Sequence, residues 1–404
     1  MAFDGFENRK KLFPDVHPCY KFGLLQVENT RLKDEAAPMR CRFMLTSPAT
    51  LTDSSTAFDY TLADIRATSP RHWAFMEVAH GRTDLEILAR IYGRFPALDP
   101  EWLDFRTELH ATNDKRIFHE KRKPHFLPLY KGASIWQYDS RFAEPEYWLD
   151  PEEFDAYLRN KEISRLIDDV YPQLTPNDKK SKEHNVLSAL GLHQRAELGA
   201  FITPDREYYR LGFRDIARDT DERTLIATVL PKDIGAQNTL WLTIPKKYQM
   251  NFEKRIVSVE KFSLTKLFFA QALFSSIPLD WLIRFTAAIH VNKTHLMRQP
   301  MPQPTDEELH SNPVYIEMVR NSLLLSCHYN KENFSPLLAD YDLTETAVPT
   351  TAKQMDLLKI RNDILVAGLY GIEYADMEHI LKSFNVLHNK KPGYVAALLA
   401  AMRN

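Results

Sequence analysis

The sequence predicts a mixed α/β protein with more than one domain. Its 404 residues exceed the roughly 100 to 200 that one domain usually takes. Hydrophobic residues make up 44% of the chain and charged residues 26%, as is typical of a chain that folds around a core. Runs rich in β-branched and aromatic residues occur beside runs with helical spacing of apolar residues, so we expect both strands and helices.

The N-terminal part is predicted to form a sheet edge followed by short helices. The run YKFGLLQV at residues 20–27 has the composition of a buried strand, and residues 40–45 are expected to form a second one. Helical spacing follows at residues 61–67 and at residues 83–90, where Thr83 is a candidate N-cap.

The middle of the chain is predicted to alternate between strands and helices. The Lys- and Arg-rich stretch NDKRIFHEKRK at residues 113–123 precedes an aromatic run with a Lys-Gly turn at residues 131–132, which predicts a hairpin. Residues 151–170 have helical spacing, and the polar run TPNDKKSKE at residues 175–183 is the best internal linker candidate. A β-branched run closed by proline predicts a buried strand at residues 224–230.

The last third is predicted to be mainly helical. Large apolar residues on several faces of residues 263–285 indicate a buried helix pair, with Pro278 marking the break. An extended, proline-stiffened connector, MRQPMPQPTDEE, follows, and Asn312 with Pro313 is expected to begin a helix. From Met355 onward we expect helices, interrupted by the strand-like or looped SFNVL.

Charge and cysteine content exclude several classes of protein. A net charge of −2 is unlike that of a non-specific nucleic-acid coat, so any DNA contact must come from local patches. The three cysteines, without a Cys-x-x-Cys, fit a reducing compartment. With no apolar run long enough for a membrane span and no signal-peptide pattern, we expect a cytoplasmic protein without a membrane partner.

The motifs of several common chemistries are absent from the sequence. Only 12 glycines occur, and none forms the glycine-rich turns that bind S-adenosylmethionine or nucleotides, so no cofactor is expected in this chain. His290, His295 and Cys327 do not have metal-ligand spacing, and we expect structural histidines and no metal site. A nuclease pattern can be drawn only through Asp169 and Asp178-x-Lys180, a short motif that arises readily by chance.

Several separated segments resemble one family, the large type IIG-like adenine-N6 DNA methyltransferases of combined restriction-modification and phage-defence systems. The resemblance is to the C-terminal half of these proteins, appears in family order and spans nearly the whole chain. The segments that carry it are FENRKKLFPDVHPCYKF at residues 6–22, LHATNDKRIF at 109–118, LPLYKGASIWQYDSRF at 127–142, YRLGFRDIARDTDERTLIATVLP at 209–231, LFSSIPLDWLIRF with HVNKTHLMRQPMPQP within 273–304, and IRNDILVAGLYGIEYADMEHILKSFNVL at 360–387.

The resemblance implies a domain organisation and a division of labour. Residues 1–110 would be the end of a methyltransferase-like sheet with short connecting helices, residues 111–345 a target-recognition domain, and residues 346–404 a C-terminal helical segment. In the family the donor-binding and Asn-Pro-Pro-Tyr motifs lie upstream of the first matching segment, so no catalytic residue has a position here. Double-stranded DNA and a methyltransferase catalytic subunit, which would bind S-adenosylmethionine, are the implied partners. Family members more often have Asn at the position of Asp221.

Candidate DNA-binding residues follow from the chemistry of readout. Base edges are read by Arg, Lys, Asn and Gln, and phosphates by Arg, Lys and backbone groups. Four arginines spaced four, four and five apart beside a predicted strand form the first group; the alternative is a solvated face with ion pairs to Asp215, Asp219 and Glu222. Trp136, Gln137 and Tyr138 are either a stacking contact or, more often for such a run, core. The candidates are Arg210, Arg214, Arg218 and Arg223, then Lys246, Lys247, Asn292, Lys293 and His295.

The function expected from the sequence is DNA recognition for a site-specific adenine-N6 methyltransferase, whose catalytic domain is a separate chain or has been lost. One rival is a non-enzymatic decoy or interaction protein that docks on a methyltransferase or another defence component. A second rival is a metal-dependent nuclease that uses the weak acidic pattern. An upstream gene with the donor-binding and Asn-Pro-Pro-Tyr motifs would favour the split enzyme over the decoy.

Overall fold

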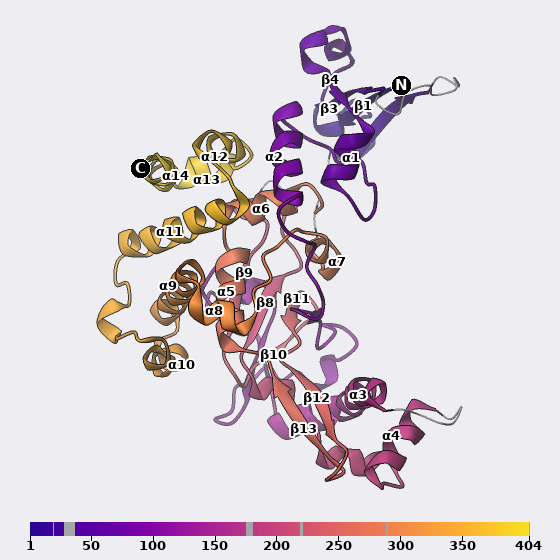
Figure 1. Ribbon diagram of the computed structural model, residues 1–404, viewed down its shortest axis with the longest axis vertical. Helices are drawn as coiled ribbons and strands as arrows, with labels where there is room; N and C mark the ends of the chain where they lie inside the picture. The colour runs from indigo at the N-terminus through magenta and orange to yellow at the C-terminus, as the bar shows by residue number, and fades with distance from the viewer. Residues whose placement is uncertain (19, 28–36, 175–180, 219–220, 288–289, 404) are drawn as a thin grey trace.

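The protein is a mixed α/β molecule in which small sheets are joined by helices (Figure 1). The computed structural model describes residues 1–404 apart from 19, 28–36, 175–180, 219–220, 288–289 and 404. An N-terminal sheet lies at one end of the long axis, and a two-stranded hairpin with two helices lies at the other. Between them, the central sheets pack against the helices of the C-terminal third.

The N-terminal sheet has the strand order β2-β1-β3-β4. Its strands are β1 (Ala2–Glu7), β2 (Lys21–Gln26), β3 (Met39–Leu45) and β4 (Phe58–Tyr60), with β1 parallel to β3 and antiparallel to β2. The expected sheet edge is confirmed, because β2 is the outer strand. The expected burial of β2 is wrong: Leu24 and Leu25, on opposite faces of the strand, are 50% and 61% exposed.

Two helices connect this sheet to the centre. Helix α1 (Leu62–Thr68) begins with a capping box between Thr61 and Asp64. Helix α2 (Arg82–Tyr92) begins one residue earlier than expected, and its N-cap is Gly81 instead of Thr83. Gly81 has a φ of 67°, a backbone conformation that glycine adopts without strain. The helix therefore begins directly after this glycine.

The central strands form two sheets, with the orders β10-β6-β7 and β5-β11-β8-β9. The hairpin expected at Lys131-Gly132 is wrong, because strand β6 pairs antiparallel with β7 only after a 3₁₀ turn and a long connection. A Cβ on Gly132 would lie 2.8 Å from the carbonyl oxygen of Thr239, so this glycine serves a close backbone approach rather than a hairpin turn. The strands are β5 (Phe105–Arg106), β6 (Leu127–Tyr130), β7 (Tyr147–Leu149), β8 (Arg210–Arg214), β9 (Ala227–Leu230), β10 (Gly235–Ala236) and β11 (Leu240–Thr243).

A second core lies around the long helix α3 (Pro151–Val170), whose bounds match the prediction. The Asp150 side chain accepts hydrogen bonds from the N–H groups of the first turn, and Pro151 occupies its first position. Helix α3 packs with α4 (Lys182–Leu190) against the antiparallel hairpin of β12 (Lys246–Asn251) and β13 (Ile256–Lys261). The linker predicted at residues 175–183 lies mostly outside the described residues, and its last part begins α4.

The remaining helices form most of the largest core. Helix α5 is buried almost throughout, and α6 begins at Ile277 with Pro278 in its first turn, which confirms the predicted helix pair. SFNVL is not a strand, because Asn385 begins a helix. The helices are α5 (Leu264–Phe274), α6 (Ile277–Arg284), α7 (Lys293–Met297), α8 (Asp306–Ser311), α9 (Pro313–Tyr329), α10 (Lys331–Phe334), α11 (Ala352–Tyr370), α12 (Tyr374–Leu381), α13 (Asn385–Lys390) and α14 (Pro392–Met402).

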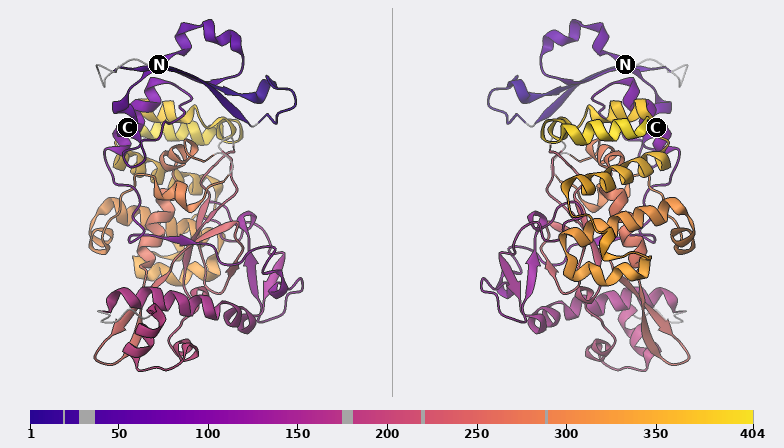
Figure 2. Two further views of the ribbon diagram at one scale, coloured as in Figure 1. Left: turned by 90° about the vertical axis from the view of Figure 1, so that its right-hand side faces the viewer. Right: turned by 90° about the vertical axis from the view of Figure 1, so that its left-hand side faces the viewer.

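The N-terminal and C-terminal parts of the chain lie side by side. Figure 2 shows the N-terminal sheet next to the C-terminal helices in both views. Leu85 of α2 and Ile380 of α12 belong to the same hydrophobic cluster, and Arg90 and Asp376 form an ion pair of 2.5 Å between the two helices. Among the described residues, no helix is both long and apolar enough to cross a membrane.

Candidate nucleic-acid interface

Two of the four candidate arginines are buried and form ion pairs in the interior. Arg210 on β8 is 1% exposed; its Nη1 lies 2.8 Å from Glu108 Oε1 and its Nη2 donates to the carbonyl of Ile234. Arg223 is 4% exposed and binds Asp280 at 2.8 Å. The expectation that all four line one exposed surface is therefore wrong for these two. Their positive charges are matched by buried carboxylates, since an unpaired buried charge would be strongly destabilising.

The other two arginines reach the surface to different degrees. Arg214 is half-buried; its Nε donates to the Ile135 carbonyl at 3.0 Å, and its guanidinium lies 5.0 Å from the centre of the Trp136 ring. Burial lowers the pKa of Arg214 to about 10. Arg218 is exposed, and no acceptor lies within hydrogen-bonding distance of its guanidinium in the described part of the chain. Its backbone N–H donates to Asp221 at 3.0 Å, an acceptor role that Asn could also fill.

The residues beside Trp136 belong mainly to the core. Gln137 is buried and its Nε2 donates to the Ser275 carbonyl at 3.2 Å. Tyr138 is buried as well, and its hydroxyl accepts a hydrogen bond from Asn362. The core interpretation of this run is therefore confirmed for Gln137 and Tyr138.

The two candidate lysines on β12 are already paired. The ammonium of Lys246 is buried between Glu162, at 3.1 Å, and Asp205, and burial lowers the pKa of this lysine. Arg106 and Arg165 bind the same two carboxylates, so the group is a buried ion network that ties α3 to the sheets. Lys247 is half-buried and forms an ion pair with Glu101.

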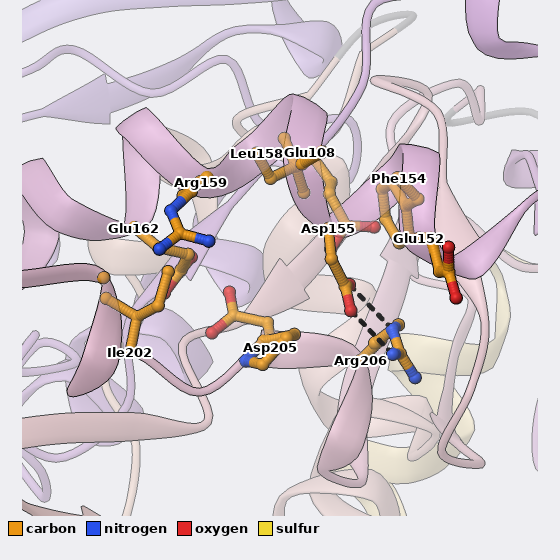
Figure 3. A pocket seen from close by; sticks show the side chains of 13 residues that line it. Glu108, Glu152, Phe154, Asp155, Leu158, Arg159, Glu162, Ile202, Asp205 and Arg206 are labelled. Carbon is orange, nitrogen blue, oxygen red and sulfur yellow. Dashed lines mark hydrogen bonds and ion pairs between the residues drawn. The ribbon is translucent and has the colours of Figure 1, made fainter. Parts of the chain in front are cut away.

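A cavity of about 360 Å³ lies beside this ion network, between α3 and residues 199–206 (Figure 3). Five of its side chains are acidic and two are arginines, and three of the acids, Glu108, Glu162 and Asp205, form ion pairs with cations of the interior. One arginine, Arg206, is bound to Asp155 by two hydrogen bonds of 2.8 and 2.7 Å, drawn as dashed lines in Figure 3. The charged lining residues are Glu108, Glu152, Asp155, Glu162, Asp205, Arg159 and Arg206.

The acidic pattern considered for a nuclease is only partly described. Asp169 accepts a hydrogen bond from the backbone N–H of Tyr248 at 3.0 Å, and burial raises the pKa of its carboxyl group. Asp178 and Lys180 lie outside the described residues. The described part of this pattern thus serves to join α3 to β12.

A loop at residues 215–218 and a segment at residues 290–298, which contains α7, lie against each other. Residues 215–218 and 290–298 are joined by a hydrogen bond from the Val291 N–H to the Asp215 carbonyl and by a bridge between Ile216 and His290. We call residues 215–218 and 290–298 the loop pair. It brings Asp215 and Ile216 against His290 and Val291, which precede the second group of candidates, Asn292, Lys293 and His295.

Within the loop pair, some polar groups are engaged and others face solvent. The Asn292 side chain caps α7, and the Lys293 ammonium lies 2.5 Å from Asp104. Burial lowers the pKa of His295, which favours its neutral form. Arg298 is exposed, as is Arg218, so the loop pair presents two guanidinium groups at the surface.

An exposed basic surface lies in the Lys- and Arg-rich segment of residues 113–123, where Glu120 is exposed as well. It follows Asp114 and consists of five exposed cations, for which no salt bridge occurs within the described part of the chain. Their backbone is fixed: Ile117 and Phe126 are buried, and His119 exchanges backbone hydrogen bonds of 2.9 and 2.8 Å with Trp148. We call this surface the basic platform; its residues are Lys115, Arg116, Lys121, Arg122 and Lys123.

Aromatic rings hold three of the platform cations in place. Arg116 lies 5.0 Å from the Tyr157 ring centre, Arg122 lies 4.9 Å from that of Trp148, and Lys123 lies 4.7 Å from that of Phe126. A ring orients a cation without cancelling its charge, unlike a carboxylate. The platform therefore presents oriented positive charges to solvent, which is what a surface that contacts a polyanion requires.

The solved structures similar to this chain include two restriction-modification enzymes. One is the type IIL restriction-modification enzyme MmeI in complex with DNA, with 10% sequence identity, a TM-score of 0.36, and a match covering 88% of this chain and 42% of that chain. The other is the type IIG restriction endonuclease BpuSI, with 11% identity, a TM-score of 0.35, and coverage of 91% and 43%. The chain thus spans less than half the length of either enzyme. No family model matches the sequence, and no curated protein is significantly similar to it.

Proposed function

We propose that this chain is the DNA-recognition part of a site-specific adenine-N6 DNA methyltransferase of a restriction-modification or phage-defence system. The observation that carries the proposal is the basic platform, with its exposed, ring-oriented cations and no carboxylate partner among the described residues. The ordered sequence segments that resemble the C-terminal half of that family support it. The donor and the target adenine would bind a catalytic part supplied elsewhere.

In this proposal the two surfaces have different tasks. The basic platform contacts phosphates, which sets the position of the duplex but does not read its sequence. The loop pair supplies the exposed Arg218 and Arg298 for contact with base edges, because guanidinium groups donate two hydrogen bonds to guanine. Fixing the register in this way matters, since flipping an adenine out of the stack costs a few kcal/mol.

Salt-dependent DNA binding tests the platform. Labelled duplex DNA of random sequence is titrated with the chain at salt concentrations from about 50 to 200 mM. Each lost phosphate contact reduces the magnitude of the negative slope of log K against log salt by about 0.9, so replacing three cations should reduce the magnitude by about 2.7. The test variant carries Arg116→Gln, Arg122→Gln and Lys123→Gln.

A matched variant controls for net charge. It removes two arginines and a lysine that are exposed but paired with carboxylates, by Arg141→Gln, Lys331→Gln and Arg361→Gln. We expect this control to keep nearly the original slope. Equal losses in both variants, or no loss in the platform variant, would refute the platform as the phosphate contact.

A second measurement tests recognition itself. Binding is repeated with the catalytic subunit present, and the preferred sequence is selected from the random pool. Arg218→Ala should relax the preference at one base position and cost roughly 1 to 3 kcal/mol on the selected site. If the chain binds the catalytic subunit but the complex selects no sequence, the proposed function is wrong and the interaction-protein alternative is favoured.

A further inference from the structure

Two histidines and an aspartate meet between α2 and α12. His80 precedes α2, Asp84 lies in its first turn, and His379 lies on α12. His379 Nε2 lies 2.8 Å from Asp84 Oδ1, and His80 Nδ1 lies 3.7 Å from Asp84 Oδ2. One donor atom from each residue lies within 4.8 Å of the other two. The sequence offered no signal for this group, because His379 is 295 residues away from Asp84.

The group combines a buried acid with a route to solvent. The Asp84 side chain is 1% exposed and that of His379 is 10% exposed, whereas His80 is 31% exposed. The carboxylate also accepts the backbone N–H of His80 at 2.8 Å, which fixes its orientation. Arg82 and Arg90, the arginines of α2, are engaged elsewhere, with Asp64 and Glu86 and with Asp376 respectively. No Lys or Arg forms an ion pair with Asp84 in the part of the chain that the structure describes.

We propose that His80, Asp84 and His379 bind a divalent transition metal of the zinc class. Two imidazole nitrogens and one carboxylate oxygen are a common ligand set for such ions, with a fourth position left to water. Ligand atoms about 2.0 to 2.2 Å from a tetrahedral ion lie roughly 3.3 to 3.6 Å apart. His80 Nδ1 lies 3.7 Å from Asp84 Oδ2, close to this value, whereas His379 Nε2 contacts the other oxygen, Oδ1. The carboxylate would therefore bind the ion through both oxygens or rotate to present one of them, and the donor atoms, now within 4.8 Å of one another, would draw together. The 2.8 Å hydrogen bond of His379 needs to open by less than about 1 Å.

The nitrogen ligands argue against magnesium and calcium. These hard cations prefer sets made of oxygen ligands, and here two of three donors are nitrogens. The open side lies toward His80, the most exposed of the three residues. The ion would join the segment before α2 to the C-terminal helices, beside the ion pair of Arg90 and Asp376. Because it would bind the folded protein only, it would stabilise this junction.

Metal titration tests the site without any assay of DNA. The untagged full chain is treated with chelator and then titrated with Zn²⁺ alone or Co²⁺ alone, by calorimetry and by visible absorption. We expect one equivalent of metal, a tetrahedral or five-coordinate Co²⁺ spectrum, and a higher melting temperature with metal. His80→Ala should weaken the affinity by more than about tenfold.

Two further variants separate metal binding from simple hydrogen bonding. His379→Gln keeps an N–H donor for Asp84, so it should fold and melt like the metal-free protein but lose most of the affinity. His119→Ala removes a histidine–carboxylate pair elsewhere, with Glu153, and should leave metal binding unchanged. If the wild-type chain takes up no metal, or if His80→Ala and His379→Gln bind it as tightly, the three residues are only a hydrogen-bonded junction and the proposal is wrong.

Discussion

Replacing the buried Arg223 should destabilise the fold without a direct effect on DNA contact. Arg223→Met keeps most of the side-chain length and removes two interactions, the Nε contact with Asp280 at 2.8 Å and the Nη2 bond to the Ser275 carbonyl at 2.6 Å. It leaves a buried carboxylate, since Asp280 is fully buried. The free energy of unfolding should therefore fall.

The remaining partners of Asp280 set the size of this loss. Breaking a buried ion pair by removing one partner costs about 3 to 5 kcal/mol. Asp280 keeps the Nε of Arg284 at 3.0 Å and the N–H of Thr224 at 3.0 Å, so its charge is still partly compensated. We therefore expect a loss near the lower end, about 3 kcal/mol.

Urea unfolding followed by circular dichroism measures this loss. The exposed Arg218 supplies the control: Arg218→Met should change the free energy of unfolding by less than about 0.5 kcal/mol. DNA binding is measured for both folded variants. A stable Arg223→Met variant with weakened DNA binding would show that Arg223 faces the nucleic acid, and would refute its assignment to the core.

Two further predictions concern a buried acid and an exposed strand. Burial raises the pKa of Asp363 to about 6, above its value in the unfolded chain. As pH rises, the unfolded chain therefore releases this proton before the folded chain does. The free energy of unfolding should fall as pH rises from about 4 to 6 and then level off. Asp363→Asn should remove this slope and be more stable than wild type at pH 7 by up to about 3 kcal/mol, as measured by urea unfolding; parallel pH profiles for both proteins would contradict the prediction. On the edge strand β2, Leu25→Lys should reduce association of the chain with itself or with a partner strand, without lowering its stability. Analytical ultracentrifugation checks this, and a wild-type protein that stays monomeric at every concentration, and does not bind the product of the upstream gene, would argue against an unpaired edge.

Elements with local signals could be predicted closely from the sequence. Helix α3 has an Asp cap, a proline in its first turn and apolar residues at helical spacing, so its start is specified by neighbouring residues. The same holds for α9, where the Asn312 side chain caps the helix and Pro313 begins it. The hairpin wrongly expected at Gly132 shows the limit of such local signals. A glycine is needed there because the backbone passes close to Thr239, which is 107 residues away in the sequence.

The candidate arginines could not be sorted from the sequence, because their partners are distant. Glu108 is 102 residues from Arg210, and Asp280 is 57 residues from Arg223. The carboxylates near the arginine series in sequence, including Asp215 and Glu222, instead bind His290 and two C-terminal lysines. Whether each arginine is buried depends on how the sheets and helices pack together. The spacing of four or five residues between the arginines carries no information about this packing.

The basic platform shows why a near-neutral net charge is a weak guide to the local charge of a surface. Many acidic side chains form ion pairs in the interior or at the surface, as Glu162 and Asp205 do with the buried Lys246. The platform cations are oriented by aromatic rings, so their charge reaches solvent although the chain as a whole carries only −2. With about five phosphate contacts, its salt slope would be at most about 4.5 in magnitude, which is modest. Under the proposed function, weak non-specific binding of this kind would let the chain leave wrong sites easily, and specificity would then depend on the loop pair and on the proposed catalytic partner.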